Sequence, residues 1–393
     1  MEAILPTGYK KTKVGVIPED WNLYRIDEVL KRVRKPLEVK PDENYQEIGI
    51  RSHGKGLFYK EFTTIDEIGD KSVFWIEPDC FIVNIVFAWE QAIGKTTSNE
   101  IGMIASHRFP MYKPQKNVLD LDYLLYLFKS KRGKYLLELA SPGGAGRNKT
   151  LGQGEFAELK IPLPSYQEQQ KIAQILTTWD EAIIKQEQLV KEKEQFKKGL
   201  MQKLLSGEVR FDGFTDEWKF IKLGDLLAYE QPTKYLVSNT NYSDDYEVPV
   251  LTAGKTFILG YTNETEGIHK DNLPVIIFDD FTTATQFVDF PFKAKSSAMK
   301  ILKPRNSSID IKLIYELMQM INFVADDHKR YWISEYQELE IKLPCEEEQR
   351  KIADILIFAS KEIDLLKNEL EELKQQKKGL MQKLLTGEVR VKI

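Results

Sequence analysis

The segment KKGLMQKLL occupies residues 197–205, and the same nine letters return at residues 377–385. The tetrapeptide Gly-Glu-Val-Arg at 207–210 likewise returns at 387–390, so both matches have an offset of 180 residues. Identity on this scale within one chain indicates an internal duplication, which decides how the rest of the sequence is divided.

The duplication extends backwards from these segments. The pattern Glu-Gln-x-Lys-Ile-Ala-x-Ile-Leu at 168–176 is repeated at 348–356, again at an offset of 180. A weaker match joins Trp21 in DWNLYRIDEVL to Trp218 in EWKFIKLGDLL, at an offset of 197. Because the offset changes between the two matches, we expect two copies that share a framework and differ by insertions in a variable region.

The repeat predicts four consecutive segments. They are a first globular domain at 1–160, a first helix at 161–210, a second globular domain at 211–340, and a second helix with a short tail at 341–393. A chain of 393 residues is long enough for two domains of ordinary size with helices between them.

The helical segments carry a coiled-coil pattern, in which apolar residues recur at steps of four and three. In the second copy they are Ile352, Leu356, Ala359, Ile363, Leu366, Leu370 and Leu373. In the first copy they are Ile172, Leu176, Trp179, Ile183 and Val190, with Gln186 interrupting the seam. Each helix is predicted to begin after a Leu-Pro pair, with Ser165 as the N-cap of the first, and to end near Gly207 or Gly387.

The connectivity predicts that the two helices are antiparallel. The first ends where the second domain begins and the second starts where that domain ends, and the ends of a compact domain usually lie close together. Inside the domains, 80–83 and 273–278 are predicted strands, and 119–129 and 309–320 are predicted short helices. The predicted fold class is α+β: two mixed α/β globular domains separated by two long antiparallel coiled-coil helices, with a pseudo-two-fold internal repeat.

Composition excludes several classes of protein. Only two cysteines occur, Cys80 and Cys345, which excludes a disulfide scaffold and fits a reducing compartment. The four histidines show no metal-ligand spacing with them, so we expect no metal site. The longest apolar run, from Cys80 to Trp89, is too short to cross a bilayer, and no signal peptide opens the chain. A cytoplasmic protein with no membrane partner is therefore expected.

Charge differs between the two halves. Residues 1–160 hold 24 Lys and Arg against 22 Asp and Glu, whereas residues 211–340 hold 13 against 21. Binding to nucleic acid would therefore rely on local basic patches.

The sequence contains none of the catalytic motifs considered for nucleotide binding, methyl transfer or DNA cleavage. The triplets Gly94-Lys95-Thr96 and Gly254-Lys255-Thr256 lack the first glycine of a phosphate-binding P-loop, because Trp89 and Pro249 stand in its place. No Asn-Pro-Pro-Tyr or Asp-Pro-Pro-Tyr motif for adenine methylation is present. The acidic pair Asp279-Asp280 has no companion at nuclease spacing and is interpreted as a solvated turn.

The duplicated motifs resemble those of one family. The helix starts LPSYQEQQKIAQIL at 163–176 and LPCEEEQRKIADIL at 343–356 carry the resemblance. So do the helix ends GLMQKLLSGEVRF at 199–211 and GLMQKLLTGEVRV at 379–391. Together with the tryptophan-containing openings of the domains, they are similar to the specificity subunit of type I restriction-modification enzymes.

The resemblance implies a non-catalytic subunit with two target recognition domains. Each would read one half of a bipartite site on double-stranded DNA, while the helices set the spacer and bind two modification subunits that methylate adenine. The resemblance places S-adenosylmethionine in the modification subunit and ATP and magnesium in the restriction subunits, so this chain is expected to hold no cofactor.

Candidate contact residues follow from the chemistry of base and phosphate recognition, which uses Arg, Lys and small polar side chains. In the first domain they are Arg51, Ser52, His53, Lys95, Arg147, Asn148 and Lys149. In the second domain they are Lys255, Thr256, Thr283, Gln286, Lys329, Arg330 and Tyr331. The repeated motif suggests Leu200, Met201, Leu380 and Met381 as partner-binding residues.

Two alternatives stay open at this point. One is a coiled-coil adaptor whose globular ends bind proteins and not DNA; salt-dependent binding to a specific duplex would separate it from the first hypothesis. The other is a nuclease or methyltransferase that acts alone, which an assay of the isolated chain with magnesium or S-adenosylmethionine would reveal.

Overall fold

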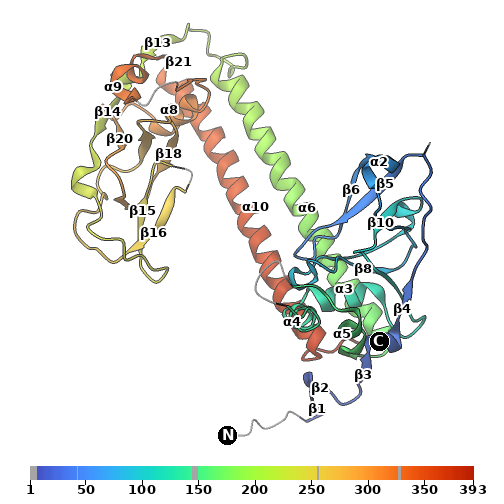
Figure 1. The fold of residues 1–393 in the computed structure, drawn as a ribbon. Coiled ribbons are helices and arrows are strands. Elements are labelled where there is room, and N and C mark those ends of the chain that lie inside the picture. Colours follow the sequence, from blue (N-terminus) through green and yellow to red (C-terminus); the bar gives the residue numbers. More distant parts are fainter. Residues whose placement is uncertain (1–6, 42, 144–148, 255, 326–328) are drawn as a thin grey trace. The chain divides into compact units, whose positions relative to one another are not determined.

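The structure is a computed structural model, and it describes residues 7–41, 43–143, 149–254, 256–325 and 329–393. The chain divides into two compact units, shown in Figure 1. The first unit consists of Met1–Glu187 with Glu369–Ile393, and the second consists of Gln188–Asn368. Each unit therefore contains one globular domain and parts of two long helices.

The globular part of the first unit is built on two four-stranded sheets. One has the order β4 (Leu30–Val33), β11 (Met111–Pro114), β8 (Phe81–Val83), β9 (Ile93–Lys95). The other has the order β6 (Leu57–Thr63), β5 (Tyr45–Ile50), β10 (Ile104–Ser106), β7 (Val73–Trp75). Two antiparallel pairs join β1 (Tyr9–Thr12) to β2 (Gly15–Pro18) and β3 (Asn22–Arg25) to β12 (Lys160–Leu163).

Short helices cover these sheets. They are α1 (Ile26–Val29), α2 (Ile65–Ile68), η1 (Ala88–Glu90), η2 (Ser98–Glu100), α3 (Leu121–Lys129), α4 (Lys131–Leu139) and α5 (Gln153–Glu158). The side chain of Asp120 accepts the backbone N–H of Tyr123 and so caps α3. The buried face of α3 carries Phe128, which packs with Phe81 and Phe156 at ring-centroid distances of 5.4 and 5.9 Å.

The second unit repeats this plan with fewer elements. A four-stranded sheet has the order β14 (Leu227–Glu230), β20 (Met299–Pro304), β17 (Val275–Asp279), β18 (Thr285–Val288). A three-stranded sheet has the order β16 (Ile258–Thr262), β15 (Val248–Leu251), β19 (Lys293–Ala294), and β13 (Lys219–Lys222) pairs with β21 (Glu340–Leu343). The helices are α7 (Leu223–Leu226), η4 (Pro232–Tyr235), α8 (Ile311–Met318), α9 (Tyr331–Ser334) and η5 (Tyr336–Glu338).

The two globular parts correspond strand by strand. The pair β13–β21 corresponds to β3–β12, and the sheet β14-β20-β17-β18 corresponds to β4-β11-β8-β9. Lys113-Pro114 of β11 and Lys303-Pro304 of β20 hold the same place, since they pair with β4 and β14 respectively. Pairing of β3 with β12 and of β13 with β21 brings the entry and exit of each domain together, as the connectivity predicted.

The elements predicted within the domains are confirmed with shifted ends. The strand predicted at 80–83 is β8, and the strand predicted at 273–278 is β17, which begins two residues later. The helices predicted at 119–129 and 309–320 are α3 and α8, each of which begins after a capping aspartate.

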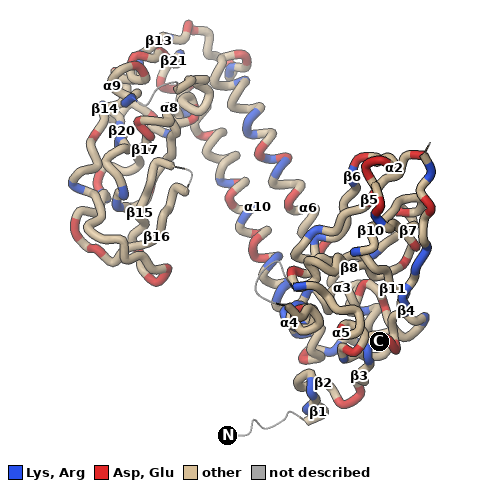
Figure 2. The backbone as a smooth tube through the Cα atoms, viewed as in Figure 1, with Lys and Arg blue, Asp and Glu red and all other residues tan. Residues whose placement is uncertain are grey.

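The two long helices are α6 (Tyr166–Leu205) and α10 (Glu346–Thr386), with 40 and 41 residues. The boundary between the units crosses each of them near its middle, so each unit holds the start of one helix and the end of the other. In the first unit, Nε2 of Gln186 donates to Glu369 at 3.1 Å and Asp180 pairs with Lys377. The residue nearer the start of α6 pairs with the residue nearer the end of α10, so the two helices are antiparallel, as predicted. Figure 2 shows basic and acidic residues interspersed along both.

The first seam residues of each long helix lie inside a globular core. Ile172 and Leu176 are fully buried in the core of the first unit, which also includes Leu384 and Leu385 of α10. Ile352 and Leu356 occupy the same place in the core of the second unit. The seam therefore begins inside each globular core and continues between the helices. The predicted N-cap is confirmed, because Oγ of Ser165 accepts the N–H of Glu168 at 3.2 Å. None of the described helices is both long and apolar enough to cross a membrane.

Candidate nucleic-acid interface and helix junctions

The arginine of the repeated Gly-Glu-Val-Arg motif closes on the start of a long helix in the second unit. Arg210 donates from Nε and Nη2 to the two carboxylate oxygens of Glu348, at 3.0 and 2.7 Å. The Glu348 side chain is fully buried and also accepts a hydrogen bond from Nε1 of Trp218, at 3.2 Å. A bidentate arginine–carboxylate pair fixes geometry as well as adding energy, so these contacts join the end of α6 to the start of α10.

The first unit contains the equivalent arginine–glutamate pair. Arg390 donates from Nε and Nη2 to the carboxylate of Glu168, at 2.7 and 2.8 Å, and from Nη1 and Nη2 to Asp20, at 2.9 and 2.7 Å. The indole of Trp21 is fully buried, with its ring centroid 6.0 Å from the Arg390 guanidinium. Hydrogen bonds to Glu168 and Asp20 raise the pKa of Arg390, and the same contact lowers the pKa of Asp20. We call Trp21–Glu168–Arg390 and Trp218–Glu348–Arg210 the two junction clasps.

A glycine makes each clasp possible. Gly387 has a φ of +75°, and a Cβ at that position would lie 2.3 Å from Cγ of Pro18. Gly207 has a φ of +73° and faces the ring of Trp218. Only glycine adopts this backbone conformation without strain, so the helix can end and the chain can turn back onto the tryptophan.

The rest of the repeated motif also packs inward. Leu204 and Leu205 are buried in the second core, as Leu384 and Leu385 are in the first. The residues predicted to bind partners, Leu200, Met201, Leu380 and Met381, are half-buried and pack against the same cores. Packing within the chain therefore accounts for part of the repeated motif, and the exposed parts of these four side chains stay available to a partner.

A turn stands at the end of β8 in the first unit and at the end of β17 in the second. In the first unit, Oδ1 of Asn84 accepts the N–H of Val86 at 3.1 Å. In the second unit, Oδ1 of Asp279 accepts the N–H of Phe281 at 2.9 Å. Side-chain oxygens of Asn and Asp stabilise such turns by bonding the backbone two residues later. We call the turns at 84–87 and 279–283 the Asx turns of the two units.

A basic segment is tied to each Asx turn. The carbonyl of Ile85 accepts the N–H of Leu151 at 2.8 Å, and the carbonyl of Asp280 accepts the N–H of Tyr331 at 2.9 Å. Lys149 and Lys329 each stand two residues before these anchored positions. The structure thus gives equivalent places to two candidates that the sequence had nominated separately.

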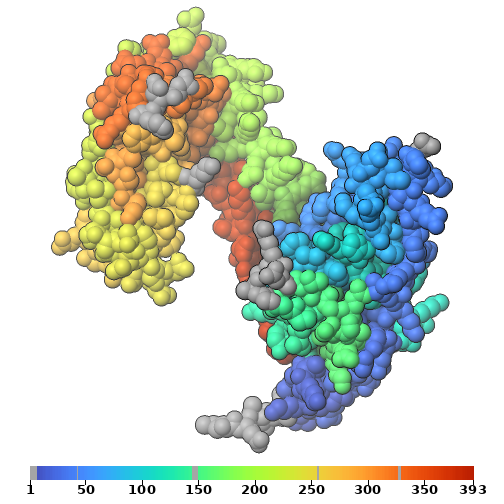
Figure 3. Space-filling view, in the orientation of Figure 1, coloured from blue at the N-terminus to red at the C-terminus, as the bar shows by residue number. Residues whose placement is uncertain are grey.

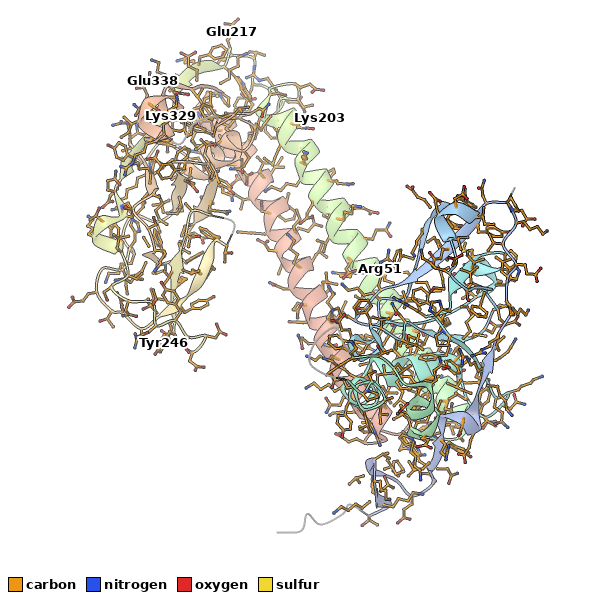
Figure 4. The ribbon with its side chains drawn as sticks, in the orientation of Figure 1. Arg51, Lys203, Glu217, Tyr246, Lys329 and Glu338 are labelled. Carbon is orange, nitrogen blue, oxygen red and sulfur yellow. The ribbon has the colours of Figure 1, made fainter. Side chains whose placement is uncertain are left out.

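The loop at Arg51, Ser52 and His53 is brought to the same part of the first unit. Its backbone and side chains contact η1, where His53 N–H donates to the carbonyl of Glu90 at 2.7 Å and Ser52 Oγ donates to its carboxylate at 3.0 Å. Lys149 Nζ lies 5.5 Å from the ring centroid of Trp89, which also belongs to η1. Arg51 and His53 are exposed, and Arg51 is labelled in Figure 4.

Lys95 is less available than the sequence suggested. Its Nζ pairs with Asp122 at the start of α3, so part of its charge is already compensated.

A cavity that sequence reasoning missed borders the first Asx turn. It has a volume of about 340 Å³ and is lined by Glu47, Lys60, Lys71, Asn84, Val86, Phe87, Ser106, His107, Arg108 and Phe109. Four of these side chains are basic or imidazole groups, and Lys60 is paired with Glu47. Their scattered positions in the chain carry no local pattern, so only the fold brings them together.

In the second unit the predicted residues are more dispersed. Thr256 is exposed, in the connection between β15 and β16. Thr283 lies in the Asx turn with a φ of +59°, and Gln286 lies on β18. Arg330 is exposed, and Lys329, labelled in Figure 4, pairs with Glu335. The other three candidates, Arg147, Asn148 and Lys255, lie outside the described residues.

Two expectations are corrected by burial. Tyr331 is only 1% exposed and packs edge-on against Phe323 at 5.3 Å, so its ring belongs to the core and not to a contact surface. Asp279 and Asp280 were expected in a solvated turn, but they are 8% and 1% exposed. The described residues contain no group of three His, Cys, Asp or Glu side chains placed to hold a metal.

The helix pair of the second unit carries an exposed apolar face. Lys193 of α6 pairs with Glu362 of α10 at 2.6 Å. Leu189 and Phe196 stand four residues before and three after Lys193, and Phe358 and Leu365 have the same spacing around Glu362. Residues at these spacings are neighbours on a helix surface, so all four surround one ion pair. Their exposed fractions are 36, 61, 72 and 69% in chain order.

Comparison with known proteins agrees with this architecture. Residues 18–192 and 215–375 match the family model of the type I restriction modification DNA specificity domain. The specificity subunit of the type I restriction enzyme EcoR124I/EcoR124II from Escherichia coli is 51% identical over 148 residues, which are 37% of this chain and 36% of that protein. A putative type I restriction enzyme MjaX specificity subunit from Methanocaldococcus jannaschii is 24% identical over an alignment of 429 residues, covering 98% of this chain and 97% of the relative.

Solved structures share the fold at low identity. The S subunit of a type I restriction-modification system from M. genitalium has a TM-score of 0.61 and 16% identity, covering 93% of this chain and 96% of its own. The HsdS subunit from Thermoanaerobacter tengcongensis has a TM-score of 0.53 and 18% identity, covering 95% of this chain and 98% of its own.

Proposed function

This chain belongs to the type I restriction-modification DNA specificity family, and from that premise we propose that each of its two units reads one half of a bipartite DNA target. The observation that supports the proposal is the duplicated Asx turn with its anchored basic segment. The backbone hydrogen bonds that anchor the basic segment correspond in the two units, whereas the turns differ in length and in the side chains that they present. One framework would then place two different sets of donors and acceptors on two half-sites.

The chain is a specificity subunit, so it selects the DNA sequence and leaves the chemistry to others. S-adenosylmethionine would be held by the modification subunit, and ATP and magnesium by restriction subunits. The family match disfavours the adaptor hypothesis, in which the globular ends bind only proteins. Action on cellular and incoming DNA would place the assembled enzyme in the cytoplasm.

Sequencing of methylated adenines tests the proposal directly. Cells that express the chain with its modification subunit should gain methylation at one asymmetric bipartite sequence. The chain expressed alone should give none, and the purified chain should neither methylate nor cut DNA. Methylation without sequence preference, or turnover by the chain alone, would contradict the proposed function.

The basic segments should contribute to affinity through phosphate contacts. Replacing both Lys149 and Lys329 by Ala should weaken binding of the complex to its target and reduce the slope of log K against log salt by about 2, because each lost phosphate contact removes about 0.9. The matched control is Lys203→Ala, an exposed lysine of α6 labelled in Figure 4. An unchanged slope in the double variant would exclude these segments from the interface.

We further propose that a modification subunit docks on the apolar face of the second unit. Figure 3 shows the outer part of α6 at the molecular surface. Exposed apolar clusters on a soluble protein commonly mark protein interfaces. The positions equivalent to Phe358 and Leu365 in the first copy are Thr178 and Lys185, so a second modification subunit would depend on more polar contacts.

Charging the apolar face should therefore impair assembly. Phe358→Glu should weaken capture of the modification subunit by about tenfold or more, as truncation of a central aromatic contact does at other interfaces. Its thermal stability should stay unchanged because the side chain is 72% exposed. Phe220→Glu, at a residue of β13 that is 65% exposed in the same unit, is the control and should assemble normally. Normal assembly of Phe358→Glu would place the docking surface elsewhere.

A further inference from the structure

Asp280 connects three segments of the second unit. Its backbone N–H donates to the carbonyl of Ala298 at 3.2 Å, and its backbone carbonyl accepts the N–H of Tyr331. Its side-chain Oδ1 accepts the N–H of Trp332 at 3.0 Å, and Oδ2 lies 3.3 Å from Nζ of Lys300. The Asx turn, the start of β20 and the start of α9 therefore meet at one residue.

The side chains of Asp280 and Lys300 are 1% and 0% exposed. Nζ of Lys300 also lies 5.1 Å from the ring centroid of Tyr229. Removing two charges from water is costly, and apolar residues of similar volume often give a fold that is equally stable. The ion pair therefore calls for a reason other than the stability of the sheet.

The first unit shows that the fold does not need this pair. There Ile85 holds the position of Asp280, since its N–H donates to the carbonyl of Arg108 at 3.0 Å and its carbonyl accepts the N–H of Leu151. Pro110 of the first unit holds the position of Lys300. Each stands directly before residues that pair in the same register, β11 with β8 in the first unit and β20 with β17 in the second. The backbone bonds are the same in both units. Among the described residues, only the second unit adds a side-chain acceptor for the basic segment.

We propose that Asp280, held by Lys300, is a positioning residue that fixes Lys329 and Arg330 against the second Asx turn for reading of the second half-site. This inference rests on the proposed function of the chain. The bond to Trp332 N–H adds a second anchor directly after the one at Tyr331, so the orientation of the preceding residues is fixed as well as their distance. The ammonium of Lys300 attracts the other carboxylate oxygen, Oδ2, from 3.3 Å and so favours this orientation of the side chain.

Neighbouring groups act in the same direction. Trp332 packs against Phe278 of β17 at a ring-centroid distance of 5.2 Å, which holds the start of α9 on the sheet. Asp279 shapes the turn itself through the N–H groups of Phe281 and Thr282. Asp279 thus forms the turn, and Asp280 docks the basic segment onto it.

Two double variants separate positioning from stability. Asp280→Leu with Lys300→Met removes the charges and the acceptor together, whereas Asp280→Asn with Lys300→Met removes the charges but keeps a side-chain oxygen for Trp332 N–H. Both avoid an unpaired buried charge, so both should fold. Each full-length variant is expressed with the modification subunit, its thermal midpoint is measured, and methylated adenines are sequenced.

The leucine variant should still unfold in one cooperative thermal transition, at a midpoint lowered only by the unpaired Trp332 N–H. It should lose about tenfold or more of its discrimination at the second half-site, comparable to the loss of one well-placed base contact. Its first half-site should stay unchanged, and the asparagine variant should retain discrimination at both. Unchanged discrimination in the leucine variant would overturn the inference. Equal loss at both half-sites, or equal loss in the two variants, would also overturn it. If the wild-type complex shows no bipartite preference at all, the proposed function fails instead.

Discussion

Glu348→Ala should lower the thermal midpoint of the protein by roughly 6–12 °C. The substitution leaves Arg210 and Nε1 of Trp218 without their shared acceptor at a site where the Glu348 side chain is fully buried. Breaking a buried ion pair by removing one partner costs about 3 kcal/mol or more. For a unit of this size each kcal/mol corresponds to about 2–4 °C. Thermal unfolding followed by circular dichroism provides the measurement.

Two variants identify the cause of the expected loss. Glu348→Gln keeps an oxygen acceptor and should lose less than Glu348→Ala. Glu338→Ala removes the ion-pair partner of Lys222. The side chains of Glu338 and Lys222 are 56 and 48% exposed, so the substitution should cost less than about 1 kcal/mol. If Glu348→Ala were as mild as Glu338→Ala, the junction clasp would not hold the end of α6 on the domain.

The junction clasps also show which features of the fold the sequence could predict. The repeated residues can be recognised without a structure. The sequence could therefore predict the two helices, their apolar seam and the correspondence of the two domains. The sequence could not predict that Glu168 is buried, because its partner Arg390 lies 222 residues away along the chain. The repeat predicts a surface for a partner, and the structure shows in addition that Leu384 and Leu385 are buried in the core of the first unit and that Arg390 binds Glu168 there. The recurrence of Trp, Glu and Arg in both copies was the signal for this contact.

The candidate interface could be predicted only in part, for a related reason. Lys149 and Lys329 could be nominated from their basic neighbours, but their equivalence depends on hydrogen bonds to Ile85 and Asp280. Lys300 stands between Met299 and Ile301 in the sequence, and nothing in that pattern indicates that it is fully buried. Side chains that pair in the core can be recognised only when the partner strand is known.

A fragment ending after residue 211 should dimerise and should direct methylation to an inverted repeat of the first half-site. The first compact unit needs residues 369–393 of α10 and the tail, which the fragment lacks. A second copy can supply 189–210 in their place, at the offset of 180 residues. Leu204 and Leu205 then replace Leu384 and Leu385 letter for letter, and an isologous dimer has true two-fold symmetry.

The exchange preserves the polar contacts at the junction. Arg210 of one copy corresponds to Arg390 and can bind Glu168 of the other, and Lys197 corresponds to Lys377, the partner of Asp180. Dimerisation is measured by sedimentation. Co-expression with the modification subunit, followed by sequencing of methylated adenines, gives the target.

The exchange also removes contacts, and one of them provides the sharpest test. In the full chain Glu187 pairs with Lys374 at 2.7 Å, but the corresponding residue of the second fragment is Glu194. Two like charges should weaken the fragment dimer, and Glu194→Lys should restore an attractive pair and tighten it, by up to about 1 kcal/mol for exposed side chains. The same substitution in the full chain breaks the pair between Glu194 and Lys367, so it should not stabilise that protein. Methylation by the fragment at a site that still contains the second half-site would refute the modular model, because the fragment lacks the domain that reads it.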